Sequence, residues 1–138
     1  MEKQGTPRPI GLVKTNVGGT RIGTWSSHTA LQNCENIPHN PPWNKRTQGY
    51  DATNWNSKGV PLLRNSIKGA VWMQGESNQA KDGRQYECLL SSMVRDWRMQ
   101  WRAGSENASD AAFPFGWGQL NSNGRSSVYN ETHPTPVS

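Results

Sequence analysis

Apolar residues are scarce in this sequence, and long runs of them are absent. They make up 32% of the 138 residues, below the roughly 45–50% that globular chains carry when glycine is counted with them. No stretch of about 18 apolar residues occurs, which excludes a membrane-spanning helix. Seven tryptophans argue against plain disorder, because disordered segments are poor in aromatic residues. The composition therefore predicts a few dense aromatic segments joined by polar stretches, as in a piece of a larger domain.

The sequence also lacks strong basic clusters, a signal peptide and more than two cysteines. Its 15 Lys and Arg residues give a formal charge of +5, but they are scattered, and Lys45-Arg46 is the tightest cluster. We therefore expect no nucleic-acid partner. Residues 1–7 have no apolar core typical of a secretory signal, so a secretory origin would require additional sequence. Cys34 and Cys88 are equally consistent with one disulfide or two reduced thiols.

Three apolar segments and one amphipathic pattern predict the secondary structure. Residues 9–17 contain a β-branched run ending at Gly18-Gly19, and residues 67–74 form an apolar run ending at Gly75, so we expect two strands. Residues 111–120 predict a third strand. Before it, apolar residues recur at steps of three and four and predict a helix. The stripe consists of Tyr86, Leu89, Leu90, Met93, Val94, Trp97 and Trp101.

The order of these elements predicts an α/β fold with a parallel sheet. Asp82 stands three residues before Gln85, as in a capping box, and Gly104 lies where a C-terminal cap belongs. Residues 22–31 predict either a short helix or an ordered loop, and residues 32–57 predict a long loop. The polar, turn-rich sequence after Leu120 predicts a frayed end.

Two glycine-containing turns follow the first two predicted strands. They are Gly18-Gly19-Thr20 and the segment from Gln74 to Asn78. Because ligands in open α/β sheets bind at the carboxyl ends of strands, both turns are candidate site residues. Backbone N–H groups of the first turn and the side-chain amides of Gln74 and Asn78 are neutral donors suited to an oxyanion. The simpler alternative is that each glycine only permits a tight reversal of the chain.

Five short blocks, in a consistent order, resemble those of the sialate O-acetylesterase family. The central one, residues 71–78, resembles that family's Trp-Tyr-Gln-Gly-Glu-Ser-Asn block, with Met73 in place of the aromatic residue. The resemblance covers about residues 9–120, which we expect to form one domain, with poorly ordered tails at 1–8 and 121–138. The other blocks are Ile10-Gly11-Leu12 with Gly18-Gly19-Thr20 and Trp25-Ser26-Ser27; Pro61-Leu62-Leu63 with Ile67-Lys68-Gly69; Arg95-Asp96-Trp97-Arg98; and Phe113-Pro114-Phe115-Gly116 with Gln119-Leu120.

The resemblance implies a fold and an activity. Members of this family are SGNH-type hydrolases with a three-layer α/β/α fold, and they remove O-acetyl groups from sialic acids without a cofactor or metal. It implies an oxyanion-hole N–H from Gly18 or Gly19, and a pocket lined by Gln74, Glu76 and Asn78. It also implies a Cys34–Cys88 disulfide and a lysosomal or extracellular location. Two tripeptides beginning at Asn107 and Asn130 match the N-glycosylation pattern.

The sequence departs from the family pattern at the catalytic residues. The Gly-(Asp/Gln)-Ser block of the nucleophile does not occur. Ser77 is a weak candidate, because it lacks the Gly-x-Ser-x-Gly elbow and its hydroxyl is equally suited to capping a turn. His133-Pro134 resembles the family's Asp-x-x-His-Pro block but lies too close to Leu120. His28 and His39 fall in expected loops and are not expected to act as the base.

Three hypotheses of function follow. The first is an incomplete sialate O-acetylesterase that is inactive as this chain. The second is a non-catalytic remnant that binds acetylated or acidic sugars through the surviving donors and exposed tryptophans. The third is a minimal hydrolase that uses Ser77 with His133. If the sheet lacks its first strand, the exposed edge predicts association with another polypeptide.

Overall fold

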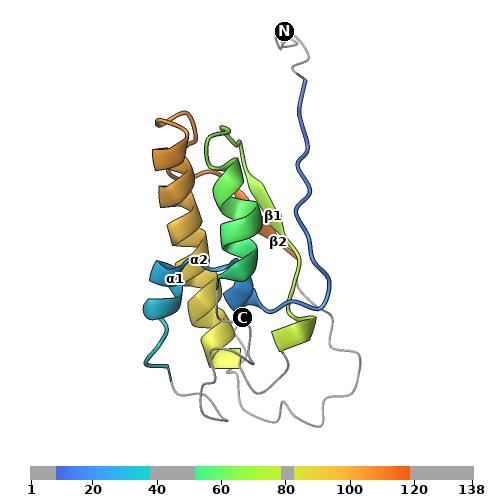
Figure 1. Ribbon diagram of the computed structural model, residues 1–138, viewed down its shortest axis with the longest axis vertical. Helices are drawn as coiled ribbons and strands as arrows, with labels where there is room; N and C mark the ends of the chain where they lie inside the picture. The colour runs from blue at the N-terminus through green and yellow to red at the C-terminus, as the bar shows by residue number, and fades with distance from the viewer. Residues whose placement is uncertain (1–8, 38–51, 79–82, 119–138) are drawn as a thin grey trace, which may run out of the picture.

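The computed structural model describes residues 9–37, 52–78 and 83–118 (Figure 1). Predictions for residues 1–8, 38–51, 79–82 and 119–138, which include Asp82, His39, Asn130 and His133, lie outside the described residues. The described chain forms short helical turns, one long helix and a two-stranded parallel sheet, in agreement with the α/β prediction. In order, the elements are η1 (Ile22–Trp25), α1 (His28–Gln32), η2 (Trp55–Gly59), η3 (Val60–Leu62), β1 (Ala70–Trp72), η4 (Glu76–Asn78), α2 (Gly83–Gly104) and β2 (Phe115–Trp117).

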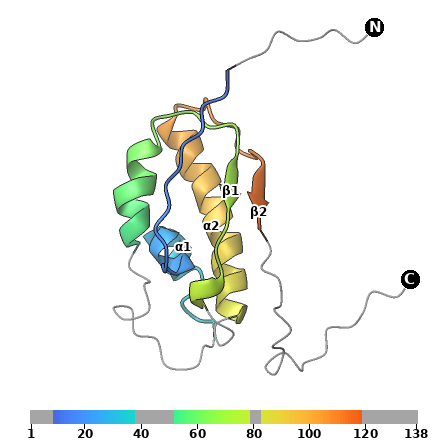
Figure 2. The same cartoon turned by 90° about the vertical axis from the view of Figure 1, so that its right-hand side faces the viewer.

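Helix α2 confirms the prediction from the apolar stripe. Leu89, Met93 and Trp97 are buried on one side of it, and this side faces the sheet and the shorter helices (Figure 2). The helix ends at Gly104 as expected, but the left-handed conformation falls on Glu106 and Asn107, with φ of 52° and 68°. Gly104 is required for close packing instead, because a Cβ there would lie 2.7 Å from the carbonyl oxygen of Leu63.

Strands β1 and β2 lie within the second and third predicted strands. They pair in parallel, with Ala70 opposite Phe115 and Trp72 opposite Trp117. The connection from β1 to β2 passes through α2, which packs against the sheet (Figure 2). This is the crossover that parallel strands require. Trp72 is buried on the covered side, whereas Val71 is exposed on the other.

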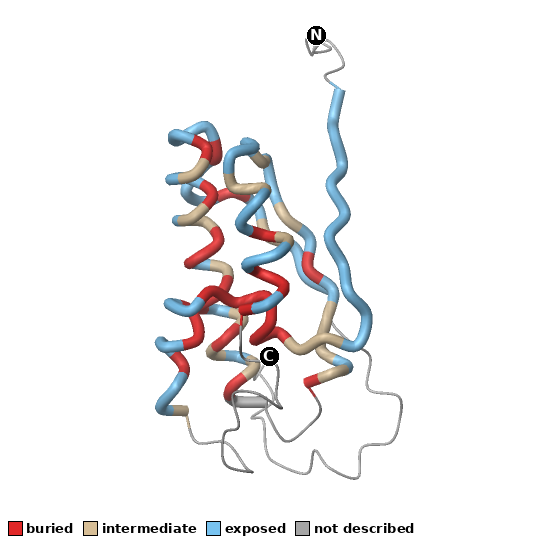
Figure 3. Tube along the Cα trace, in the orientation of Figure 1, coloured by how far each residue is buried: buried red, intermediate tan, exposed pale blue. Residues whose placement is uncertain are grey.

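The strand predicted for residues 9–17 is wrong. This segment is extended, but it joins no sheet and is exposed along its whole length (Figure 3). The side chains of Ile10, Leu12 and Val13 are among its exposed groups. A β-branched run is not sufficient for a strand, because sheet pairing and burial supply most of the stability.

The loop predicted for residues 32–57 is also partly wrong. Residues 53–63 are helical over nearly their whole length, with the π-helical turn η2 followed directly by the 3₁₀ turn η3. Trp55 is buried in this segment, and a single aromatic anchor has no periodicity that would reveal it. Residues 22–31 form η1 and α1, which fits the short-helix alternative, and the Ser27 side chain caps α1 by accepting a hydrogen bond from the Ala30 N–H.

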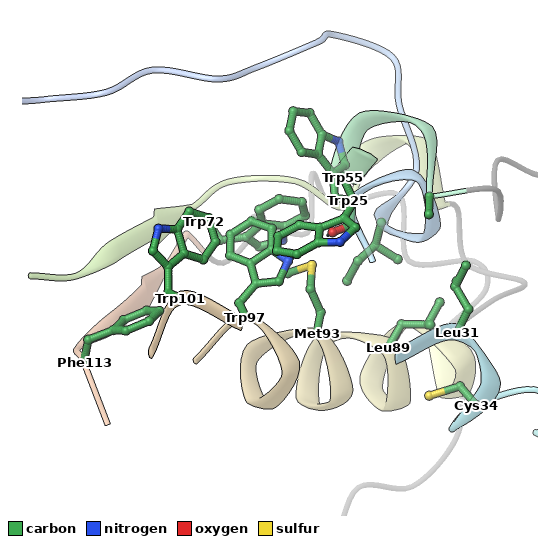
Figure 4. Packing of buried hydrophobic residues seen from close by; sticks show 12 residues of the cluster. Trp25, Leu31, Cys34, Trp55, Trp72, Leu89, Met93, Trp97, Trp101 and Phe113 are labelled. Atoms are coloured by element: carbon green, nitrogen blue, oxygen red, sulfur yellow. Dashed lines mark hydrogen bonds between the residues drawn. The ribbon is translucent and has the colours of Figure 1, made fainter. Parts of the chain in front are cut away.

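A cluster of tryptophans forms the centre of the core (Figure 4). Trp97 of α2 stacks on Trp55 with ring centroids 5.6 Å apart, and Trp72 meets it edge to face at 5.8 Å. The Trp97 indole N–H also donates to the Trp25 carbonyl oxygen at 3.1 Å. One side chain therefore joins η1, η2, α2 and β1. This arrangement shows how a chain poor in aliphatic residues builds a core, since each aromatic ring buries a large area.

A disulfide joins α2 to the segment after α1. Cys34 and Cys88 are bonded, with an S–S distance of 2.05 Å, and this confirms the pairing that the resemblance implied. Near the bond, the Asn33 side-chain amide donates to the Ser92 hydroxyl at 3.0 Å. A covalent bond and a hydrogen bond therefore connect the chain just after α1 to α2. In the described parts of the chain, no helix is long and apolar enough to cross a membrane.

Candidate functional site

The segment that follows β1 turns sharply at Gly75. Its φ of 150° lies in a region that L side chains rarely adopt, so the turn requires glycine there. The turn leads into η4, which places Asn78 inside the protein and leaves Glu76 exposed. Gln74 and Asn78 thus come from the two ends of one tight loop at the carboxyl end of β1, as predicted.

The side chains of Gln74 and Asn78 connect this loop to the chain after the Gly18-Gly19 turn. Gln74 Nε2 donates to the Thr20 carbonyl oxygen at 3.1 Å and to Asn78 Oδ1 at 2.7 Å. Asn78 Oδ1 accepts a second hydrogen bond from the Ile22 backbone N–H at 3.0 Å. Segments 54 and 56 residues apart in the sequence are joined in this way. The two predicted turns are therefore brought together.

These contacts fix the orientation of both amides. The Thr20 carbonyl accepts only, so the Gln74 atom that faces it is the nitrogen. This nitrogen and the Ile22 N–H both donate to one atom of Asn78, which must be the oxygen. The remaining atoms, Asn78 Nδ2 and Gln74 Oε1, are buried and have no hydrogen-bond partner within the described structure. The site therefore contains an unpaired neutral donor beside an unpaired neutral acceptor, and both atoms are shielded from solvent.

The turn at Gly18 and Gly19 is open. Both glycines are exposed, and a Cβ at either position would meet no atom within 4 Å. Gly19 has φ of 71°, the left-handed region that favours glycine. Thr20 anchors the end of this turn, since its hydroxyl donates to the Val17 carbonyl and accepts from the Trp25 indole N–H. The turn is thus tied down at Thr20 and unobstructed at the two glycines.

No catalytic serine and base are brought together in the described residues. Ser77 is half-buried in η4, and His28 is exposed on α1, a different element. His133, the other residue of the minimal-hydrolase hypothesis, lies outside the described residues. Within the described ranges there is also no group of three His, Cys, Asp or Glu side chains that could hold a metal ion.

A hollow lies beside the same loop, between the first turns of α2 and the ends of β1 and β2. Its volume is about 260 Å³. The lining includes Gln74 and Gly75, which also belong to the turn described above. The other lining residues are Trp72, Tyr86, Leu90, Trp117 and Gly118.

Tyr86 is the polar group that orders this hollow. Its hydroxyl donates to the Gln74 carbonyl oxygen at 2.9 Å and accepts from the Trp72 indole N–H at 3.3 Å. Burial raises the pKa of Tyr86 above its ordinary value of 10.0; the Trp72 hydrogen bond opposes this shift, and the charge of Glu76 adds to it. The sequence pattern identified Tyr86 only as a core residue of the helix, because spacing does not reveal a hydroxyl aimed at another loop.

The Asn107 glycosylation candidate lies in the turn after α2. Asn107 is exposed, whereas Ser109 of the same tripeptide is fully buried, and its side chain accepts from the Ile67 N–H at 3.0 Å. The Asn107 side chain is thus accessible at the end of α2. Glycosylation at this position stays a prediction.

Comparisons with known proteins give a consistent result. Residues 1–133 match the family described as carbohydrate esterase, sialic acid-specific acetylesterase. The chain is 37% identical over 117 residues to sialate O-acetylesterases of Pongo abelii and Homo sapiens, and 32% identical over 142 residues to that of Mus musculus. Each match covers 83% of this chain but only 22% or 26% of the relative. The chain therefore spans about a quarter of the length of these relatives.

Proposed function

The chain belongs to the sialic acid-specific acetylesterase family of carbohydrate esterases, and we propose that it forms the oxyanion-binding side of an ester hydrolase pocket. The proposed substrates are O-acetylated sialic acids or related sugar esters, in keeping with the names of its relatives. The proposed complete domain is the three-layer α/β/α fold of SGNH-type hydrolases, of which the parallel pair β1 and β2 with α2 would be one part.

The observation that carries this proposal is the amide of Asn78. It is 5% exposed, its oxygen accepts two hydrogen bonds, and its nitrogen has no partner in the described chain. A donor fixed in this way requires no reorganisation when negative charge develops on a carbonyl oxygen, which is how oxyanion holes stabilise acyl-transfer transition states. In this proposal Gly18 or Gly19 supplies a second, backbone N–H.

The other residues of the loop have supporting roles. Gln74 orients Asn78 through their 2.7 Å hydrogen bond. In this proposal the exposed Glu76 of the same loop faces the substrate at the mouth of the pocket. The aromatic hollow around Trp72 and Trp117 has room for an uncharged part of the substrate. A site of this kind combines an apolar lining with a few placed polar groups, as small-molecule sites usually do.

We further propose that this polypeptide does not hydrolyse esters alone. The sequence has neither a Gly-(Asp/Gln)-Ser block nor a correctly spaced Asp-x-x-His block. Ser77 has no base beside it among the described residues, and a serine hydroxyl without a base is a poor nucleophile at neutral pH. On this proposal the chain binds the ester but leaves it intact.

A lysosomal or extracellular location is part of the same proposal. The Cys34–Cys88 disulfide supports it, since such bonds persist in oxidising compartments and are rare in the cytosol. A glycan on Asn107 would be expected in the same compartments.

The test measures binding and chemistry separately. We expect Asn78→Ala to weaken binding of 9-O-acetyl-N-acetylneuraminic acid by about fivefold, because a well-placed buried hydrogen bond contributes on the order of 1 kcal/mol. Asn65→Ala is the matched control, since Asn65 is exposed and its side chain, within the described structure, hydrogen-bonds to the neighbouring Leu62 carbonyl and not to the candidate site. Binding is followed by NMR of the O-acetyl methyl group of the ligand. Near-ultraviolet circular dichroism verifies that each variant is folded. Equal affinities of Asn78→Ala and the unmodified chain would contradict the proposed role.

The chemical step is tested on the unmodified chain with a fluorophosphonate and an acetyl ester. We expect no adduct by intact mass and no turnover. An adduct on Ser77 accompanied by turnover would instead establish Ser77 as the nucleophile and reject the proposal that the chain is inactive alone.

A further inference from the structure

Among the described residues, one edge of β1 has no paired strand. Ala70 and Trp72 direct their backbone groups toward β2: the Ala70 N–H donates to Pro114, and the Trp72 carbonyl accepts from Gly118. In a parallel pair, the residue between two such positions points its N–H and C=O to the opposite edge. That residue is Val71, which is 89% exposed. Open edges of this kind readily pair with another chain.

The extended segment 9–17 pairs with no strand in the described parts of the chain. It runs alongside β1 in the same direction but outside the sheet (Figures 1 and 2). The only hydrogen bond to it within the described residues is from the Thr20 hydroxyl to the Val17 carbonyl. Ile10 and Leu12 are 86% and 94% exposed, so the segment contributes almost nothing to the core of its own copy. An exposed, apolar and extended segment gains stability when its backbone pairs with the edge of a sheet.

A hinge connects this segment to the folded part of the chain. Gly18 and Gly19 follow it directly, and the surroundings of both are open to 4 Å around the position of a Cβ. After them, the Thr20 hydroxyl and Ile22 N–H are fixed by hydrogen bonds. Movement of the segment would therefore be absorbed at two glycines while the structure beyond Thr20 stays in place.

We infer that two copies of this chain exchange residues 9–17, each segment pairing as an added strand with the open edge of β1 in the other copy. Exchange of an identical element is a low-cost route to a dimer. The cost is especially low here, because the segment leaves no strand pairing or apolar burial behind. The added strand can place Ile10 and Leu12, which share one face of an extended segment, beside Val71 and Met73, and all four side chains are exposed in the single copy. This inference does not depend on the proposed esterase function.

The test is sedimentation velocity of the 138-residue chain over a wide range of concentrations. We expect a monomer–dimer equilibrium. Val71→Pro removes the N–H on the open edge while leaving the Ala70 and Trp72 bonds to β2, so it should raise the dimer dissociation constant at least tenfold. Leu12→Asp should do the same from the donor side. Met99→Lys, at an exposed apolar position on α2, is the matched control and should leave the constant unchanged.

A mixing experiment separates strand exchange from simple contact between two β1 edges. Val71→Pro keeps an intact donor segment, and Leu12→Asp keeps an intact acceptor edge. An equimolar mixture should therefore form heterodimers through one remaining contact, although neither variant dimerises well alone. If Val71→Pro fails to fold by near-ultraviolet circular dichroism, Val71→Lys replaces it, since an edge lysine discourages pairing. A monomer at every concentration, a dimer indifferent to Val71→Pro, or a mixture without heterodimers would each overturn the inference.

Discussion

Residues 9–17 and residues 67–73 have similar apolar, strand-like sequences but very different environments. The second segment contains β1, which pairs with β2 and buries Trp72 beneath α2. The first is extended and exposed, with Leu12 at 94% exposure. The difference lies in the neighbours: α2 and β2 follow β1 closely in the chain and cover one face and one edge of it. Both segments are extended, and only the one that is paired with a neighbouring strand and covered by a helix is a strand of the sheet.

The contrast predicts where the stability of the molecule resides. Trp97→Ala removes the ring that joins four elements, and we expect it to lower the free energy of unfolding by about 3–5 kcal/mol. Leu12→Ala, in the exposed segment, should change it by less than about 0.5 kcal/mol. Urea denaturation followed by circular dichroism measures both, at a concentration low enough to keep the chain monomeric. A similar loss for the two variants would show that residues 9–17 are packed in solution.

A second prediction concerns the covalent link between α1 and α2. Reducing Cys34–Cys88 should lower the free energy of unfolding by about 2–4 kcal/mol, because the bond closes a long loop and restricts the unfolded chain. The comparison is urea denaturation with and without dithiothreitol. The double variant Cys34→Ser/Cys88→Ser is the control, and its unfolding midpoint should not respond to the reductant. If the unfolding midpoint of the unmodified chain also does not change with dithiothreitol, the disulfide does not contribute to the stability of the fold.

A smaller effect than that of the disulfide is expected at Tyr86, which links the covered side of the sheet to the candidate site. Tyr86→Phe removes the hydrogen bonds to Gln74 and Trp72 and should cost about 1–2 kcal/mol. Burial raises the pKa of Tyr86 above 10.0, so its contribution is fully present below pH 10.0 and is lost as the pH rises through the raised value. Stability measured from pH 8 to 11 should therefore fall less steeply in Tyr86→Phe. Parallel curves for the two proteins would exclude this linkage.

The sequence predicted the elements that carry their own periodicity or lie between clear turns. Helix α2 was evident from seven apolar residues on one stripe, and β1 and β2 from short apolar runs ending at or containing glycine. The helical segment around Trp55 was missed because one aromatic residue in a polar stretch has no period. The error at residues 9–17 has the opposite cause. The apolar, β-branched pattern of a strand is present there, but no strand in the described residues pairs with the segment.

The sequence predicted which residues belong to the candidate site, but it did not predict the hydrogen bonds between them. Gln74 and Asn78 were identified as neutral donors at the end of a strand, and they do lie there. Gln74, however, uses both donors of its amide on Thr20 and Asn78, so of the two only Asn78 keeps an unpaired donor. Nothing in their spacing shows that Gln74 orients Asn78, or that the Thr20 carbonyl and Ile22 N–H determine which amide atom remains unpaired. These bonds join positions more than 50 residues apart, so only the folded chain reveals them.

The disulfide also decides what a protease can do to this molecule. Cys34 and Cys88 close a covalent ring that contains η2, η3, β1 and the whole Gln74–Asn78 loop. Thr20 and Ile22, which hold that loop in place, lie outside the ring. A single cut between Cys34 and Cys88 therefore yields two polypeptides that migrate as one species until the bond is reduced. A single cut in the Gly18-Gly19 turn, in contrast, frees the N-terminal segment at once and leaves the ring intact.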